Sequence, residues 1–141
     1  MAIISRESDY AVRALASLAK TDEWLSVSAM AEQEDIPEVF LRKIMQRLNR
    51  AGVVESRRGP FGGYRLAMPA EQVTVLDAVE IVQGPLVINE CFADPDICPR
   101  VDFCPLRRRL SEIQVELNAK LAELNLAAVL DDTRAREASS R

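Results

Sequence analysis

The chain has 141 residues, of which 48% are hydrophobic and 28% charged, a composition typical of one compact domain with an extension and not of a disordered protein. It contains no histidine, so catalysis with a histidine base and zinc sites built on histidine are excluded. The net charge of −4 disfavours nucleic acid as a partner, yet residues 37–65 hold 7 basic and only 2 acidic side chains. Such a segment is typical of a phosphate-contacting surface, although short charge clusters also occur on solvated faces.

No apolar run approaches the roughly 18–20 residues that a membrane helix needs, and the first residues lack the apolar core of a signal peptide. We therefore expect a cytoplasmic protein with no membrane partner. Aromatic residues make up 5% of the chain and there are only 5 glycines, which disfavours an all-β sandwich or barrel. A mainly helical fold is expected.

Two helices are predicted in the N-terminal part. Ser5 can cap the first helix, and its apolar residues recur at helical spacing: Ala11, Leu15 and Leu18. The polar residues 20–23 end it. A short second helix is expected from about Ser28, followed by a tight turn at residues 34–36.

The third predicted helix runs from Pro37 to about Ala51 and ends at Gly52. On a helical wheel its core side consists of four apolar residues: Leu41, Ile44, Met45 and Leu48. The opposite side is mostly basic and amide, and we predict that it contacts DNA through five residues: Val39, Arg42, Lys43, Gln46 and Arg50. A short helix, a tight turn and a helix with an exposed basic face form the layout of a helix-turn-helix.

A β-hairpin is predicted directly after this helix. Residues 53–56 and 64–66 are its strand candidates, and residues 57–63 form a glycine-rich turn. A hairpin in this position is a wing, and Arg57 and Arg58 are predicted to reach phosphates or a narrow minor groove. A nucleotide-phosphate loop is disfavoured because no helix follows the glycines at once. A plain surface hairpin is the alternative.

The next predicted helix opens at Thr74, where Thr74 and Asp77 resemble a capping box, and ends at Gly84. The longest helix is expected from Pro105 to about Asn125. Its apolar residues follow steps of three and four: Leu106, Leu110, Ile113, Leu117, Leu121 and Leu124. One small winged domain cannot cover so long a stripe, so we expect it to pair with a second copy in a homodimer. Packing on its own winged domain is the alternative.

The predicted fold class is therefore mainly α with a small β-hairpin wing, a winged helix-turn-helix domain joined to a long C-terminal dimerisation helix. Residues 1–70 form the DNA-binding domain. Residues 71–130 contain a linker helix, a cysteine loop and the dimerisation helix. Residues 131–141 are charged and small, and a disordered tail is expected there.

Cys91, Cys98 and Cys104 lie in one acidic, proline-rich loop at residues 89–104. A structural disulfide is disfavoured by the odd count and the reducing compartment, and three unrelated buried cysteines would be expected in apolar helices or strands. Structural zinc prefers four strong ligands in tighter knuckles. Three cysteines at wide, unequal spacing fit an iron–sulfur cluster better.

The chain resembles the Rrf2 family of winged-helix transcription regulators, and within it the iron–sulfur branch that includes IscR, NsrR and RirA. The resemblance extends from residues 8–13 to about Leu130. Its most specific pieces are the wing, residues 58–67, and residues 48–54 before it; the cysteine loop and the closing residues 124–130 also match.

The resemblance implies that Cys91, Cys98 and Cys104 bind an iron–sulfur cluster. The cluster-biogenesis subgroup has a histidine three residues after the third cysteine, whereas this chain has Arg107, so a 2Fe–2S site that uses this histidine is impossible. This departure favours the nitric-oxide-sensing or iron-sensing subgroups, for which the resemblance implies a 4Fe–4S cluster, with 2Fe–2S as the alternative. The resemblance also implies that Asp9 reaches the cluster of the partner subunit, whereas Asp9 on its own also suits the start of a helix.

Together these expectations describe a homodimeric regulator, not an enzyme, that binds a two-fold symmetric double-stranded DNA operator and senses nitric oxide, iron or redox state. Base contacts are expected from Arg42, Lys43 and Gln46. No small-molecule substrate is expected. One rival is a cluster-free regulator with a thiol redox switch. A small iron–sulfur electron carrier is the other, and it would need neither wing nor recognition helix.

Overall fold

The computed structural model describes residues 2–140, which form seven α-helices and one antiparallel hairpin. The helices are α1 (Arg6–Ala19), α2 (Val27–Glu34), α3 (Glu38–Arg50), α4 (Val75–Gln83), α5 (Glu90–Ala93), α6 (Pro105–Glu123) and α7 (Leu126–Ser139). The strands are β1 (Val54–Arg57) and β2 (Gly63–Leu66), and short 3-10 turns lie at Ala70–Gln72, Pro95–Ile97 and Val101–Phe103. The mainly helical fold with a hairpin wing is confirmed. Among the helices of residues 2–140, none combines the length and hydropathy of a membrane-spanning segment.

Local sequence signals position the first three helices. The Ser5 hydroxyl accepts the backbone N–H of Ser8 at the start of α1, as predicted, and Ser26 caps α2 in the same way. Asp35 ends α2 in the left-handed conformation, with φ of 52°, and so turns the chain into α3. The core side of α3 is buried: Leu41, Ile44, Met45 and Leu48. Burial of this apolar side fixes α3 against the core of the domain.

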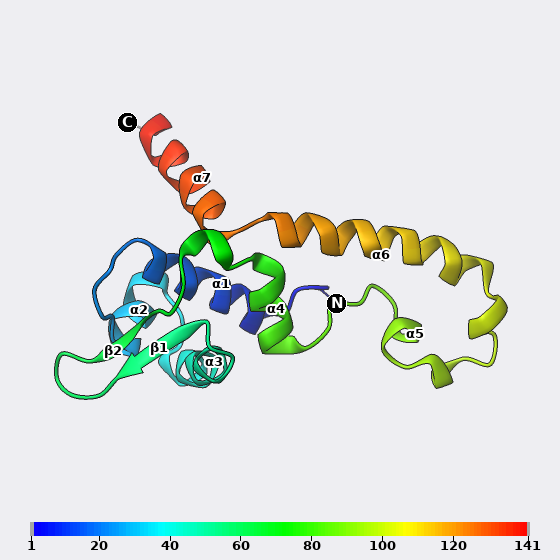
Figure 1. Cartoon of the computed structure of the whole chain (residues 1–141), viewed down its shortest axis with the longest axis horizontal. Helices are drawn as coiled ribbons and strands as arrows, with labels where there is room; N and C mark the ends of the chain where they lie inside the picture. The colour runs from blue at the N-terminus through cyan, green and yellow to red at the C-terminus, as the bar shows by residue number, and fades with distance from the viewer. Residues whose placement is uncertain (1, 141) are drawn as a thin grey trace.

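The hairpin extends from the same body. Strands β1 and β2 pair antiparallel, with Glu55 opposite Arg65, and Leu25 pairs with Tyr64 on the outer side of β2. The Leu25 and Tyr64 backbones exchange hydrogen bonds of 3.0 and 2.8 Å. These bonds join the base of the wing to the segment between α1 and α2. Figure 1 shows the wing and α3 side by side at the lower edge of the molecule.

Helix α4 connects the winged body to α6. The predicted capping box at Thr74 and Asp77 is present, and Gly84 ends the helix. α4 contacts α1, α3 and α6. A second apolar cluster lies between α4 and the C-terminal half of α6: Val75, Val79 and Leu86, with Leu76, Leu117, Leu121, Leu124, Val129 and Val12 packed against it.

The long helix α6 has no fully buried residue in the isolated chain. Leu117 and Leu121 pack toward α4, whereas Leu106 and Ile113 are 62% and 54% exposed. Figure 1 shows α6 running away from the winged body, with the cysteine segment folded back beneath its first turns. The predicted stripe thus packs against α4 in the C-terminal half of α6 and is exposed to solvent in the N-terminal half.

Residues 131–139 continue α7 as a helix, where a disordered tail was expected, and Arg141 lies outside the described residues. The helix begins with buried Leu126 and Leu130, which anchor it on the body. Beyond them its side chains are largely exposed, and the composition is rich in strong helix formers such as alanine, arginine and glutamate. Low hydrophobicity is common to solvated helices and disordered tails, so it did not discriminate between them.

Candidate nucleic-acid interface and cysteine cavity

The polar side of α3 is exposed along its whole length, as predicted. All five residues expected to contact DNA are exposed there: Val39, Arg42, Lys43, Gln46 and Arg50. Val39 is 68% exposed and offers an apolar side chain of the kind that can meet a thymine methyl group. The face therefore offers cations, an amide and a small apolar group along one helix, which are the groups that read a major groove.

Glu38 is a carboxylate at the edge of this face. It accepts a hydrogen bond of 3.0 Å from the hydroxyl of Ser28 on α2 and also bonds the guanidinium of Arg42. The Ser28 and then the Arg42 hydrogen bonds hold the pKa of Glu38 below its usual value. Glu38 thus ties the two helices together and orients Arg42, while it occupies one side of that guanidinium.

Arg47 belongs to α3 but is turned away from the side that is predicted to contact DNA. Its guanidinium donates a hydrogen bond of 2.8 Å to the carbonyl oxygen of Val82 in α4 and lies 3.6 Å from the carboxylate of Glu7. It anchors the recognition helix to the two helices behind it. Sequence reasoning missed this role, because the partners of Arg47 are Val82 and Glu7, which lie far from it in the sequence.

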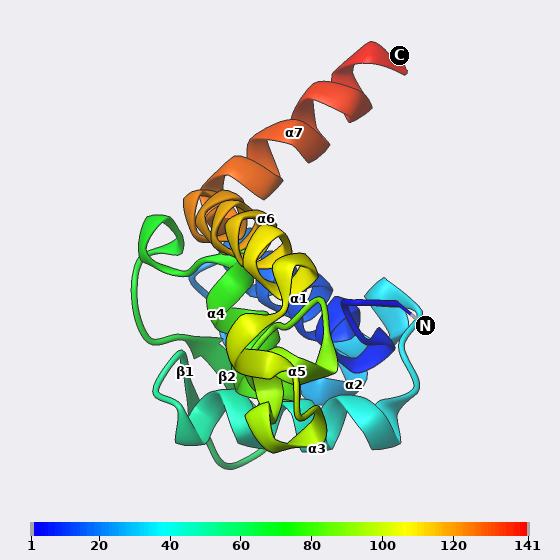
Figure 2. The ribbon, with the colours of Figure 1, turned by 90° about the vertical axis from the view of Figure 1, so that its right-hand side faces the viewer.

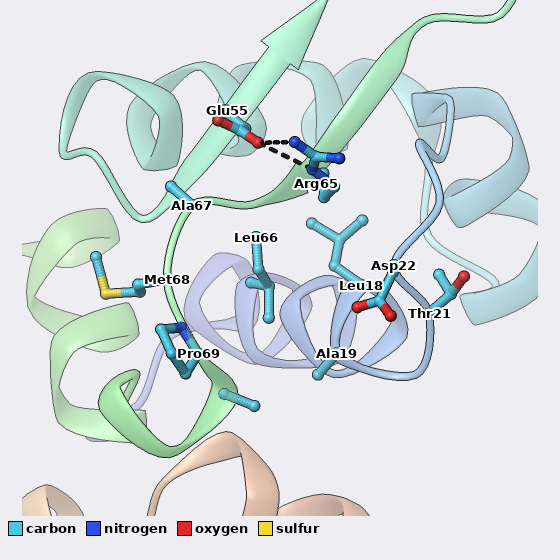
Figure 3. A pocket seen from close by; sticks show the side chains of 11 residues that line it. Leu18, Ala19, Thr21, Asp22, Glu55, Arg65, Leu66, Ala67, Met68 and Pro69 are labelled. Atoms are coloured by element: carbon cyan, nitrogen blue, oxygen red, sulfur yellow. Dashed lines mark hydrogen bonds and ion pairs between the residues drawn. The ribbon is translucent and has the colours of Figure 1, made fainter.

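The wing is held by an aromatic side chain that sequence reasoning also missed. The guanidinium of Arg57 lies over the ring of Trp24, 4.7 Å from its centroid, and that of Arg65 lies 4.4 Å from the same centroid. Arg65 in addition donates to Glu55 on the paired strand, as Figure 3 shows. Arg58, in contrast, is exposed and makes no ion pair within residues 2–140. Arg57 positions the hairpin, and Arg58 is free to meet phosphate.

The hollow drawn in Figure 3 lies on the other side of this ion pair, between the end of α1 and the chain after β2. Leu18, Leu66 and Met68 form its apolar part, and Asp22 and Arg65 also line it. It contains none of the residues predicted to bind DNA or a cluster. We assign it to the base of the wing.

All three cysteines face one cavity of about 290 Å³ at the far end of the molecule. They are free thiols, and each is partly buried. Asn89, Glu90 and Arg107 line the same cavity, together with apolar Ile97, Val101 and Leu106. No three His, Cys, Asp or Glu side chains in residues 2–140 lie close enough together to hold a single metal ion. The loop thus gathers the three predicted ligands around one space without a preformed mononuclear site.

Arg107 places positive charge in this cavity. Its guanidinium lies 5.2 Å from the ring centroid of Phe92, and its Nε is buried without a hydrogen-bond partner in the described chain. The backbone N–H of Arg107 points to the sulfur of Cys104, at 3.5 Å, in the first turn of α6. A buried donor without an acceptor is costly, and a helix N-terminus favours an anion. An anionic group that binds the three thiolates would fit the N-terminus of α6.

Asp9 lies in the first turn of α1 and its side chain is 62% exposed. Its carboxylate pairs with Arg13, 3.3 Å away, and Arg13 also donates to the backbone carbonyl of Glu34. It does not line the cysteine cavity of its own chain. A role at the cluster would therefore require the second subunit, as the resemblance implied.

Comparison with known proteins identifies the family. Residues 4–132 match the family model described as "Rrf2: Iron-dependent Transcriptional regulator". The chain belongs to the Rrf2 family. Relatives are named as transcription regulators and not as enzymes, so the prediction of a DNA-binding transcription regulator is confirmed at this level.

Individual Rrf2 relatives cover almost the whole chain. Protein aau3 of Rhizobium meliloti (strain 1021) is 38% identical over 94% of this chain and 86% of its own. The HTH-type transcriptional regulator NsrR of Bacillus subtilis (strain 168) is 31% identical over 87% of this chain and 86% of its own. The solved structure of CymR from B. subtilis, described as the global cysteine regulator, has a TM-score of 0.78 at 25% identity and covers 93% of this chain and 98% of its own.

Proposed function

We propose that this Rrf2 protein is a homodimeric transcription regulator whose DNA affinity depends on an iron–sulfur cluster held by Cys91, Cys98 and Cys104. The carrying observation is the cavity of about 290 Å³ that all three cysteines line together with Arg107. The family description as iron-dependent supports the same reading. A 4Fe–4S cluster is preferred over 2Fe–2S, because no histidine is present as fourth ligand and the resemblance to the nitric-oxide-sensing or iron-sensing subgroups implies 4Fe–4S.

The cluster would supply iron that reacts with nitric oxide or oxidants and that is lost when iron is limiting. Residues of the chain itself would connect the cluster site to the rest of the fold. Gln114 of α6 accepts the backbone N–H of Ile88 at 2.8 Å and donates to the carbonyl of Leu86 at 2.8 Å. The segment that leads into the cysteine loop is thereby tied to α6. Immediately before it, Val82 at the end of α4 holds Arg47 of α3.

These bonds form a route from the cysteine loop to the recognition helix. A change in the loop would shift residues 86–88, then the end of α4, and then the anchor of α3 through Arg47. The physical requirement is that the loop has two arrangements and that DNA binds one of them better. Bound cluster would select one arrangement by holding the three cysteines together.

Homodimerisation is proposed through the exposed part of α6. Leu106 and Ile113 are open to solvent in the single chain, on the first half of the helix. Two copies packed along this stripe would bury it and present two wings and two α3 helices to a two-fold symmetric operator. In that dimer we place Asp9 of one subunit near the cluster of the other, as a weak oxygen ligand.

DNA contact is proposed for the exposed face of α3 and for the wing. Arg42 and Lys43 would read guanine and Gln46 would read adenine in the major groove. Val39, Arg50, Arg57 and Arg58 complete the predicted interface, with Arg57 acting mainly through the position of the wing. The positive charge of residues 37–65 would supply the salt-dependent part of the affinity.

A thiol redox switch without a cluster is the second proposal. It is favoured by the three free cysteines around one cavity and by the structural likeness to CymR, the global cysteine regulator. In this case oxidation of two thiols would change the loop in place of cluster loss. Both proposals predict that DNA affinity depends on Cys98, so mutation of the cysteine alone does not separate them.

An anaerobic absorption spectrum of the purified full chain separates the two proposals. Wild type is expected to be coloured, and Cys98→Ala to be colourless with altered DNA affinity. Asp9→Ala is expected to keep the cluster with a changed spectrum and faster loss. A colourless wild type, whose DNA binding follows only thiol oxidation, would overturn the cluster. Identical spectra and stability for Asp9→Ala and wild type would exclude Asp9 as a ligand.

A further inference from the structure

Phe61 stands at the tip of the wing and is 84% exposed, the most exposed large hydrophobic side chain in residues 2–140. Phe61 belongs to neither apolar core cluster, and it is not among the residues predicted to contact DNA. A phenyl ring held in water at the end of a hairpin loses the stabilisation that burial would give. Such a residue is expected to be buried when a partner binds.

The backbone that carries Phe61 is tightly held. The side chain of Arg57 donates a hydrogen bond of 2.6 Å to the carbonyl oxygen of Phe61, and the N–H of Gly62 donates to the carbonyl of Gly59 at 3.0 Å. A Cβ at Gly62 would lie 2.1 Å from the carbonyl oxygen of Arg57, so only glycine allows the chain to turn back so closely. The ring is thus presented outward from a closed turn.

Trp24 supports this turn from the body of the protein. Its ring lies under the guanidinium of Arg57, which in turn holds the Phe61 carbonyl. The neighbouring residue Leu25 is hydrogen-bonded to Tyr64 of β2. The tip is therefore ordered before it meets a partner, and little conformational entropy is lost on binding.

The surroundings of the tip favour DNA as that partner. Arg58, an exposed cation without an ion pair in the described chain, lies three residues before Phe61. In both ribbon views the wing lies on the same lower side as α3, away from α6 and α7. A duplex that received α3 in its major groove would therefore pass by the wing at the adjacent minor groove.

We propose that Phe61 is an apolar wedge that enters this minor groove and partly unstacks one base step. Apolar side chains inserted in this way kink the duplex, and the flexible pyrimidine–purine steps are the least costly to open. Phe61 would then select a deformable step at a fixed distance from the bases that α3 contacts. The inference rests on the DNA-binding function and adds a specificity-determining residue to it.

The test uses the full chain and duplexes that wild type selects from a random pool. One duplex of this set has 2-aminopurine at successive positions beside the α3 site. Phe61→Ala is compared with Phe61→Leu, which retains apolar bulk, and with Arg58→Ala, which removes a neighbouring cation. Binding of wild type is expected to raise the fluorescence of 2-aminopurine at the unstacked step. Phe61→Ala is expected to weaken binding to the selected duplexes about tenfold, to abolish this rise in fluorescence and to reduce DNA bending. Arg58→Ala is expected to keep the 2-aminopurine signal and to flatten the salt dependence.

Several outcomes would overturn the wedge. Unchanged affinity, bending and 2-aminopurine signal for Phe61→Ala would do so while leaving DNA binding intact. If Phe61→Ala lost affinity but wild type produced no change in 2-aminopurine fluorescence, Phe61 would contact only the DNA backbone and would not unstack a base step. A change in sedimentation for Phe61→Ala alone, with unaltered DNA binding, would assign the ring to a protein contact. Failure of wild type to select any duplex would remove the DNA-binding function together with the wedge.

Discussion

The guanidinium of Arg47 on α3 donates a hydrogen bond of 2.8 Å to the carbonyl oxygen of Val82 in the last turn of α4. The bond joins the recognition helix to the segment that leads into the cysteine loop. Only two residues separate Val82 from Pro85, where the chain leaves α4. The proposed route from the loop to α3 therefore passes through Val82, which is itself a residue of the apolar core.

Replacement Arg47→Gln removes this anchor. Because the side chain of Arg47 is 46% exposed, we expect a loss of stability of only about 1 kcal/mol, measured by urea unfolding. The larger expected effect is on coupling, so that DNA affinity no longer responds to the state of the three cysteines. The matched control is Arg50→Gln on the same helix, which should lower DNA affinity and keep the response. An unchanged response in Arg47→Gln would exclude this route.

Replacement of Arg42 or Gln46 by alanine tests base recognition by α3. Each contact is expected to contribute about 1–3 kcal/mol to discrimination between selected and random DNA. Arg42→Ala should therefore weaken binding to selected duplexes much more than to random ones, as measured by fluorescence anisotropy. Equal losses on both kinds of DNA would show that Arg42 contacts phosphate only.

The pairing of Glu38 with Arg42 adds a pH dependence. The pKa of Glu38 is lowered by the hydrogen bonds from Ser28 and Arg42, so its charged form stabilises the fold above the unfolded pKa, and this contribution is lost as the pH falls through the folded pKa. In a neutral buffer Glu38 therefore stays charged. Glu38→Gln should then free Arg42 and raise non-specific DNA affinity. Lower or unaltered affinity of this variant on random DNA would contradict the expectation.

Charge on the exposed stripe of α6 tests the dimer. Ile113→Glu should give monomers in sedimentation velocity, with weak binding to a two-fold symmetric site, because it places a carboxylate on the proposed seam. Val115→Glu is the matched control: Val115 is also exposed, at 68%, but lies two residues on and so on the opposite side of the helix. Leu117 is a less suitable position for this test, because it packs against the apolar cluster between α4 and α6 and its replacement would also disturb the fold. A dimeric Ile113→Glu protein that binds DNA normally would place the interface elsewhere.

Arg107→Gln tests the charge in the cysteine cavity. If an anionic cluster binds there, the variant should form it anaerobically but lose it about tenfold faster to a chelator, with a shifted absorption spectrum. Arg108→Gln, an exposed neighbour on the same helix, should behave like wild type. Identical spectra and loss rates for wild type and Arg107→Gln would show that the guanidinium does not act on the cluster.

The sequence by itself determined the elements that depend on local chemistry. Caps at Ser5 and Thr74, the core side of α3 and the polar side opposite it were all readable from residue type and spacing, because each follows from hydrogen bonds or burial within one helix. The wing was readable from its glycines. The three cysteines were readable as a group from their common loop.

Only the tertiary structure decided how side chains of equal chemistry divide their roles. Arg47 and Arg50 are both cations of α3, yet one contacts α4 and the other solvent. Arg57 is held by Trp24 while its neighbour Arg58 is exposed, and the leucines of α6 split between α4 and solvent. Within its own helix or strand, a charged or apolar side chain is compatible both with solvent exposure and with contact to another element. The choice depends on which surface folding brings opposite it, and that surface comes from residues distant in the sequence.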